Sequence, residues 1–409
     1  MPCSSSWAAS LLLALATHAS AVPVSDASTD SLSGSLMYAY KTKDGVNSLN
    51  KNWYQNDTGL WGGWWNSGNA LTTIGDFVLS SPAVSQGTNP YHIIANTFDK
   101  AQHVTVQTAK FMNFAKGGMM KSQYCINGSG ACGSKRDGSL TKRGFTDFLN
   151  EFYDDEGWWA LALIRAYDVT QEDKYLQAAV AVFKDMQTGA GTPCGGIYWS
   201  KERKYVNAIA NELYLSVAAS LANYDLPGQS SYLKIANDQW TWFSNSGMIN
   251  SENLINDGLD DKCNNNGQQT WTYNQGVILG GLVQLFHATG NRTLLGEATK
   301  IAKAAINKLS NKDGVLVEYG GCEYTEGRCG ADGQQFKGIF IRNLGYLHKV
   351  SPDAQFRSFI LTNANAIWKK DREESSNKLG VAWAGPYYDA TSHTQSSALD
   401  ALVAAIGAA

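Results

Sequence analysis

The sequence lacks a strong charge of either sign and has few histidines. Lys and Arg number 33 and Asp and Glu 36 among 409 residues, so the formal net charge is −3. It has no strongly basic patch and no glycine-rich phosphate loop, which argues against a nucleic-acid-binding protein. The six histidines are scattered, and no Ser-His-Asp arrangement can be argued from them. These absences exclude a nucleic-acid partner and a typical serine hydrolase.

Long apolar runs are also missing. The run at 11–16 is too short to span a membrane, which needs about 20 apolar residues. With the small residues at 19–21 it is typical of a secretory signal, so residues 1–21 are predicted to be a signal peptide. The C-terminal stretch 398–409 contains Asp400 and follows no polar spacer, so no GPI anchor is expected. The mature protein is therefore expected outside the cell or at the cell wall, with no membrane span.

Cysteines are seven, and no CxxC motif or matching His pair supports a zinc site. Removal of the signal peptide leaves six, an even number that suits an oxidising compartment. In each of two pairs the cysteines lie seven positions apart in a glycine-rich loop and could form a local disulfide. The two remaining cysteines would then pair with each other by elimination. The expected disulfides are Cys125–Cys132, Cys322–Cys329 and Cys194–Cys263. Glycosylation sequons, which agree with secretion, occur at Asn56, Asn127 and Asn291.

Strand-like alternation is scarce, and helical periodicity recurs along the chain. Twelve helices are predicted, at 31–54, 66–82, 92–116, 145–168, 172–188, 205–224, 229–246, 271–290, 293–310, 334–350, 353–370 and 393–407. Short connections join them into pairs, and longer loops, among them 117–144 and 311–333, separate the pairs. No linker divides the chain. The pattern predicts a single all-α domain over 22–409, an (α/α)6 toroid whose inner helices surround a cleft. A monomer is expected.

Two adjacent carboxylates, Asp154 and Asp155, stand where a helix should become apolar, with Trp158 and Trp159 one turn further on. Acidic residues are common in the first helical turn, so solvated charges are the alternative. Asp155, however, falls on the apolar stripe of the helix. Neighbouring positions could bring the carboxyl groups to about 5–6 Å, near the ~5–5.5 Å of retaining glycosidases. Two close carboxylates also separate each other's pKa values, as an acid and a nucleophile require.

Aromatic and amide residues cluster at the starts of alternate helices. Helix capping explains Asn, Ser and Asp at such places, but it does not explain Trp, Tyr and Gln. Because aromatic rings stack on sugars and amides bind hydroxyl groups, these residues are predicted to bind substrate. The candidates are Trp64, Asn66, Asn69, Asn207, Asn211, Trp271, Tyr273, Asn274 and Gln275. For each of them packing or capping is the alternative.

A second acidic cluster occupies 257–261, before the helix predicted at 271–290. Asp257 is predicted to bind sugar hydroxyl groups, with a solvated turn or a calcium-like loop as the alternative. The Asp spacing does not match an EF-hand loop. No metal and no organic cofactor are expected.

The motif at 153–159, Tyr-Asp-Asp-Glu-Gly-Trp-Trp, resembles glycoside hydrolase family 76, the α-1,6-mannanases and their fungal cell-wall relatives. Segments 64–69, 271–276 and 336–340 support the resemblance, which covers nearly all of the mature chain. It implies an (α/α)6 barrel and a retaining double displacement on α-1,6-mannan. It also implies that Asp154 is the nucleophile and Asp155 the acid/base.

Fungal transglycosidases of this family act on GPI glycans and usually carry a GPI signal. They often have an acidic residue after the first Trp pair, where this chain has Asn66. Both departures favour a secreted, endo-acting mannan endo-1,6-α-mannosidase acting on mannan or mannooligosaccharides. A cell-wall transglycosidase and a non-catalytic glycan-binding protein remain as alternatives, and the intact Asp pair argues against the second.

Overall fold

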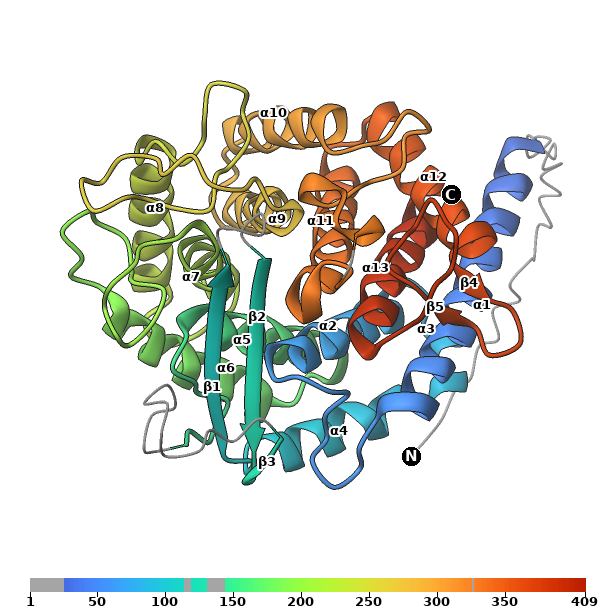
Figure 1. The fold of residues 1–409 in the computed structure, drawn as a ribbon, viewed down its shortest axis with the longest axis horizontal. Coiled ribbons are helices and arrows are strands. Elements are labelled where there is room, and N and C mark those ends of the chain that lie inside the picture. Colours follow the sequence, from blue (N-terminus) through green and yellow to red (C-terminus); the bar gives the residue numbers. More distant parts are fainter. Residues whose placement is uncertain (1–25, 114–118, 131–143, 326) are drawn as a thin grey trace, which may run out of the picture.

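The computed structural model describes residues 26–113, 119–130, 144–325 and 327–409, and helices dominate it (Figure 1). The part of the chain that the structure describes holds twelve helices of twelve residues or more. Six form an inner ring: α2 (Trp65–Ser80), α5 (Tyr153–Thr170), α7 (Ala208–Leu221), α9 (Thr272–Thr289), α11 (Gly330–Val350) and α13 (Ser392–Ala408). Six lie outside: α1 (Asp26–Trp53), α4 (Pro90–Ala101), α6 (Asp173–Met186), α8 (Gln229–Asn245), α10 (Thr293–Lys308) and α12 (Ala354–Lys370).

The inner helices close into a ring. Each packs on the next in the order α2, α5, α7, α9, α11, α13, and α13 packs back on α2. An outer helix connects each inner helix to the next along the chain. In the ring α6 packs on α5, α8 on α7, α10 on α9 and α12 on α13. The inner helices therefore run in one direction and begin at one end of the ring. This confirms the predicted (α/α)6 barrel.

Burial explains which helices are inside. Every residue of α7 is buried, whereas α6 buries one stripe, formed by Tyr175, Leu176, Ala179, Val182, Phe183 and Met186. A helix that is apolar on all sides must be covered on all sides, and a one-sided helix needs only one neighbour. Glycines allow the inner helices to approach closely. A Cβ on Gly276 would lie 2.6 Å from Phe340 Cα, and one on Gly338 would lie 2.4 Å from Ser397 O.

The predicted helix 92–116 is correct only as far as Ala101, and the predicted loop after it contains a strand. α4 ends at Ala101, and the chain continues as β1 (Val106–Asn113), which pairs antiparallel with β2 (Met119–Ile126). A short β3 (Ser129–Gly130) extends this sheet. The β-branched residues of 104–108 favour an extended chain, and the hydrophobic pattern that resembled a helix belongs to a strand. Figure 1 shows the hairpin running from beside α4 toward the middle of the ring, and β2 packs on α11.

Smaller elements complete the described chain. They are α3 (Pro82–Ser85), three 3-10 turns (Gln86–Thr88, Gln187–Gly189 and Tyr319–Tyr324), and a two-stranded ribbon of β4 (Arg372–Glu373) and β5 (Lys378–Leu379). None of the described helices has the length and apolar character needed to cross a bilayer.

Two predicted disulfides, Cys194–Cys263 and Cys322–Cys329, are present in the structure. Cys132 lies outside the described residues, so its pairing with Cys125 stays a prediction, as does the signal peptide at 1–21. The sequon residues Asn56, Asn127 and Asn291 are exposed, as glycosylation would require.

Candidate active site

The Asp pair lies in the first turn of α5, at the end of the ring where the inner helices begin. The preceding residue, Phe152, is extended, and the backbone of Tyr153 bonds to Trp199 O. Neither aspartate is solvated: Asp154 is 3% exposed and Asp155 is fully buried. The alternative of surface charges at a helix start is therefore wrong, because a buried carboxylate needs a partner or a use.

The third acidic residue of the motif has a structural partner. Glu156 is buried, forms an ion pair with Lys201 and accepts a hydrogen bond from Asn150 N. It therefore joins the start of α5 to two loops. Glu156 is thus bound to residues of these loops.

A lysine of the hairpin, which the sequence analysis missed, lies between the two aspartates. Lys110 Nζ is 2.8 Å from Asp154 Oδ2 and 2.6 Å from Asp155 Oδ1. These two oxygens are therefore at most about 5.4 Å apart, the sum of the two contacts. The ammonium is also 4.8 Å from the ring centre of Phe152 and 5.6 Å from that of Trp199. The predicted carboxyl separation of a retaining glycosidase is compatible with this geometry.

Burial controls the protonation of Asp155. Desolvation raises its pKa, the Lys110 ammonium opposes this, and the neighbouring Asp154 adds to it, so that the pKa is about 8. Asn150 Nδ2 also donates to Asp155 Oδ2 over 2.6 Å. The pKa of Lys110 is raised above its usual value, because its carboxylate neighbours outweigh the burial that lowers it. At neutral pH Asp155 can therefore hold a proton.

A third carboxylate, Asp332, faces the same ammonium from the first turn of α11. It accepts hydrogen bonds from Trp65 Nε1 at 3.0 Å and from the Ser122 backbone of β2 at 2.8 Å. Burial raises its pKa, and Lys110 opposes the rise. The sequence analysis missed Asp332 because it placed 311–333 in a loop, whereas α11 begins at Gly330.

Aromatic rings from four inner helices pack on one another near the carboxylates. Trp65 stacks on Trp158, with ring centres 5.6 Å apart. Tyr273 stacks on Phe336 at 3.8 Å, and Trp271 meets the same ring edge-on at 5.7 Å. The predicted Trp64 is buried as well, and it packs on Trp159 rather than on these rings.

The structure divides the predicted polar residues into two groups. Four are held by the protein: Asn69 by Arg342, Asn207 as the cap of α7, Asn211 by Ile197 and Gln239, and Gln275 by Ile255. For these four the alternative of capping or packing describes the contacts seen. Asn66 donates to Gln335, but its amide oxygen has no partner among the described residues. Three residues of the α9 start keep unpartnered buried polar atoms, and they are Trp271, Tyr273 and Asn274.

Asp257 lies among these groups. It is buried and accepts a hydrogen bond from the Tyr205 hydroxyl. Burial raises its pKa to about 6, hydrogen bonding opposes the rise, and Asp154 adds to it. The alternative of a solvated turn is therefore wrong for Asp257, although Asp260 and Asp261 are exposed.

Comparison with known proteins identifies the family. The model of glycosyl hydrolase family 76 matches residues 136–408. The chain belongs to glycosyl hydrolase family 76. The mannan endo-1,6-alpha-mannosidase DFG5 of Saccharomyces cerevisiae is 30% identical over 251 residues, 56% of this chain and 54% of that protein. The mannan endo-1,6-alpha-mannosidase DCW1 of Candida albicans is 28% identical, over 49% of this chain and 48% of that protein. The chain thus spans about half the length of these curated relatives.

Solved structures of family 76 share the fold. An inactive variant of an α-1,6-mannanase of Salegentibacter sp. HEL1_6, in complex with α-1,6-mannotetrose, has a TM-score of 0.68 at 18% identity, over 91% of this chain and 99% of that one. Dfg5 of Chaetomium thermophilum in complex with glucosamine has a TM-score of 0.66 at 19% identity, over 94% of this chain and 90% of that one. The hairpin that carries Lys110 lies outside the part of the chain that the family model matches.

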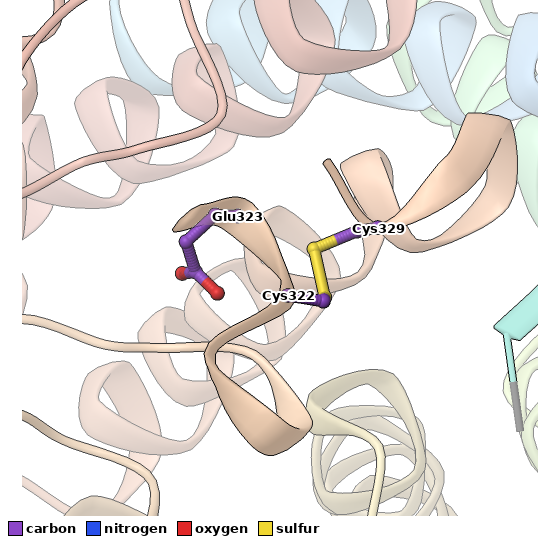
Figure 2. Close-up of side chains that lie close together, drawn as sticks. All are labelled: Cys322, Glu323 and Cys329. Carbon is purple, nitrogen blue, oxygen red and sulfur yellow. A yellow bond between two sulfur atoms is a disulfide. The ribbon is translucent and has the colours of Figure 1, made fainter. Parts of the chain in front are cut away.

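One group of side chains in this family 76 member resembles a set of metal ligands. Cys322, Glu323 and Cys329 lie together in the turn before α11 (Figure 2). The two sulfurs are joined as a disulfide, and Glu323 forms an ion pair of 2.6 Å with Lys337. The sulfurs and the carboxylate that could bind a metal are therefore engaged within the protein, and the disulfide and the ion pair stabilise the turn.

Proposed function

We propose that the protein is a secreted glycoside hydrolase that cleaves α-1,6-mannosidic linkages within mannan and retains the anomeric configuration. The observation that carries the proposal is the buried pair of Asp154 and Asp155, with oxygens at most about 5.4 Å apart beside an aromatic wall. The names of the curated relatives support the linkage. The mannotetrose complex supports the pair, because its inactive variant lacks two adjacent aspartates.

The two carboxyl groups divide the chemistry. Asp155, protonated at neutral pH, donates its proton to the glycosidic oxygen, while the Asp154 carboxylate attacks the anomeric carbon. The bond from carbon to the leaving oxygen breaks as the ester to Asp154 forms. Asp155 then takes a proton from water, and the water oxygen replaces Asp154 at carbon. Two inversions restore the α-configuration.

The test is a time course of linear α-1,6-mannotetraose followed by proton NMR. Shorter products that appear first as the α-anomer are expected. A first-formed β-anomer would exclude the nucleophilic role, and products longer than the donor would identify a transglycosidase.

Two variants assign the roles. Asp154→Asn is expected to lower kcat by about 10³-fold or more. Asp155→Asn is expected to lower kcat by a similar factor for substrates whose leaving group needs a proton. With an activated aryl mannoside, azide should restore turnover in Asp155→Asn and give the α-mannosyl azide, because azide attacks the glycosyl-enzyme without needing a base. Any azide product of Asp154→Asn should be the inverted β-mannosyl azide, because azide then takes the place of the nucleophile. The exposed Asp260→Asn serves as the control. Unchanged turnover in either variant would contradict the role proposed for that aspartate.

A further inference from the structure

We propose that Glu212 of α7, together with Asn274 of α9, binds hydroxyl groups of the saccharide unit next to the Asp pair. The inference rests on the proposed function and adds a binding residue to it. Glu212 is fully buried, and neither carboxyl oxygen has a hydrogen-bond partner among the described residues. Asn274 is equally buried, and both its amide nitrogen and its amide oxygen lack partners there.

Such groups need an explanation. A buried polar group without a hydrogen bond costs a few kcal/mol, and folded proteins rarely keep one without a role. Other buried glutamates of this barrel are bound to the protein. Glu156 pairs with Lys201, Glu323 pairs with Lys337, and Glu318 accepts from Thr272 and Tyr319. Glu212 differs from these three in that its partners have to come from elsewhere.

The surroundings place Glu212 at the candidate active site. α7 packs directly on α9, which carries Tyr273 and Asn274 at its start. The Tyr273 hydroxyl, also unpartnered, has its pKa raised by burial and by the nearby carboxyl groups of Asp257, Asp154 and Glu212. One hydroxyl thus lies within the electrostatic reach of the proposed nucleophile and of Glu212. The unpartnered atoms of α7 and α9 and the Asp pair therefore share one region of the barrel.

The chemistry of the group fits a polyol. Burial and the nearby Asp257 raise the pKa of Glu212 well above its usual range, which favours the neutral form of the side chain. A neutral carboxyl group donates one hydrogen bond and accepts others, and an amide does both as well. Sugar hydroxyl groups also donate and accept. A saccharide can therefore satisfy Glu212 and Asn274 without bringing a charge into the site.

The experiment separates binding from folding. Saccharide binding is measured by calorimetry with α-1,6-mannotetraose in an Asp154→Asn background, which prevents turnover. Glu212→Met, which keeps the length of the side chain and removes its polar atoms, is expected to weaken binding by about 10- to 100-fold. Glu212→Gln, which still donates and accepts, should recover most of the affinity. Asn274→Ala provides a second variant with the same expected loss.

Thermal unfolding distinguishes a binding role of Glu212 from a structural one, because the two roles predict opposite changes of the melting temperature. Glu212→Met should keep or raise the melting temperature, because it removes a buried group that the protein does not satisfy. The matched control, Glu318→Met, breaks hydrogen bonds that the fold uses and should lower it.

The outcomes distinguish the two proposals. If Asp154→Asn binds mannotetraose and Glu212→Met binds it equally well, the role of Glu212 is overturned while the proposed function stands. A melting temperature that falls in Glu212→Met as it does in Glu318→Met would also overturn it in favour of a structural role. If the wild type neither cleaves nor binds the saccharide, the proposed function fails and the role of Glu212 fails with it.

Discussion

The ammonium of Lys110 lies 2.6 Å from Oδ1 of Asp155 and makes its second contact, at 2.8 Å, with Asp154. In the proposed mechanism a glycosidic linkage enters the same space, because the acid has to reach its oxygen and the nucleophile its carbon. Lys110 and a bound substrate therefore exclude each other in this arrangement. Its charge also offsets the buried negative charge of the carboxyl groups around it.

Replacing Lys110 by Met should lower stability at pH 7 by about 3–5 kcal/mol, because it leaves buried carboxylates without their counter-charge. Asp155 should hold its proton to higher pH, since Lys110 opposes the rise of its pKa. The alkaline limb of the pH–rate profile, expected near pH 8, should then shift upward. Asp154, Asp332 and Tyr124 are the other titratable groups that face Lys110 or Asp155.

The control for this variant is Lys100→Met, which removes an exposed ion pair with Asp99 and should cost no more than about 1 kcal/mol. Denaturant unfolding and a pH–rate series measure the two effects. An unchanged alkaline limb in Lys110→Met would show that its ammonium does not act on Asp155.

Excision of the hairpin should leave the barrel folded and uncover the Asp pair. The hairpin leaves and rejoins the barrel at neighbouring points: Asp147 N bonds to Gln102 O at 2.8 Å, and a Cβ on Gly144 would lie 2.0 Å from Thr105 Cγ2. Joining Thr105 to Gly144 therefore needs little movement. The shortened protein is expected to melt cooperatively and to show a lower KM for mannooligosaccharides, measured by reducing-end release. Loss of the cooperative transition would show instead that the hairpin is part of the folding unit.

Stability should be highest at mildly acidic pH. Burial raises the pKa of Asp257 to about 6, of Glu318 to about 7 and of Asp155 to about 8, all above their usual values near 4. The folded state then binds protons more tightly than the unfolded state, so its stability falls as the pH rises from about 4 to 8. Melting temperatures between pH 4.5 and 8.5 test this. Glu318→Gln should flatten the curve near pH 7, and a melting temperature that rises toward pH 8 would contradict the expectation.

The two disulfides seen should differ in their effect on stability. Cys194–Cys263 closes a loop across 69 positions and Cys322–Cys329 one across 7. Loop-closure entropy predicts a loss of about 4 kcal/mol for the first and about 2 kcal/mol for the second when both cysteines are replaced by serine. Chemical denaturation of the two double variants measures the difference. Equal losses would mean that local contacts, rather than chain entropy, determine the contribution.

The helices were predictable because their signals are local. Apolar periodicity and short connections placed all twelve, and for most of them the bounds agree within a few residues. The hairpin was not predictable in the same way, since a strand is stabilised by its partner strand and by the surface it covers. The pairing of Lys110 with Ser122 across β1 and β2, and the position of β2 on α11, depend on contacts distant in sequence.

Asn211 and Asn274 show what the sequence alone determined about this protein and what the tertiary structure decided. Both stand near the start of an inner helix, and their sequence surroundings predicted the same role for both. In the folded chain Asn211 is held by Ile197 and Gln239, whereas Asn274 has no partner among the described residues. The local pattern determined the helices and placed the two aspartates near the start of an inner helix, although α5 begins at Tyr153 and not at the predicted 145. Only the tertiary structure decided which polar groups remain free for a ligand, because their hydrogen-bond partners come from other elements of the barrel.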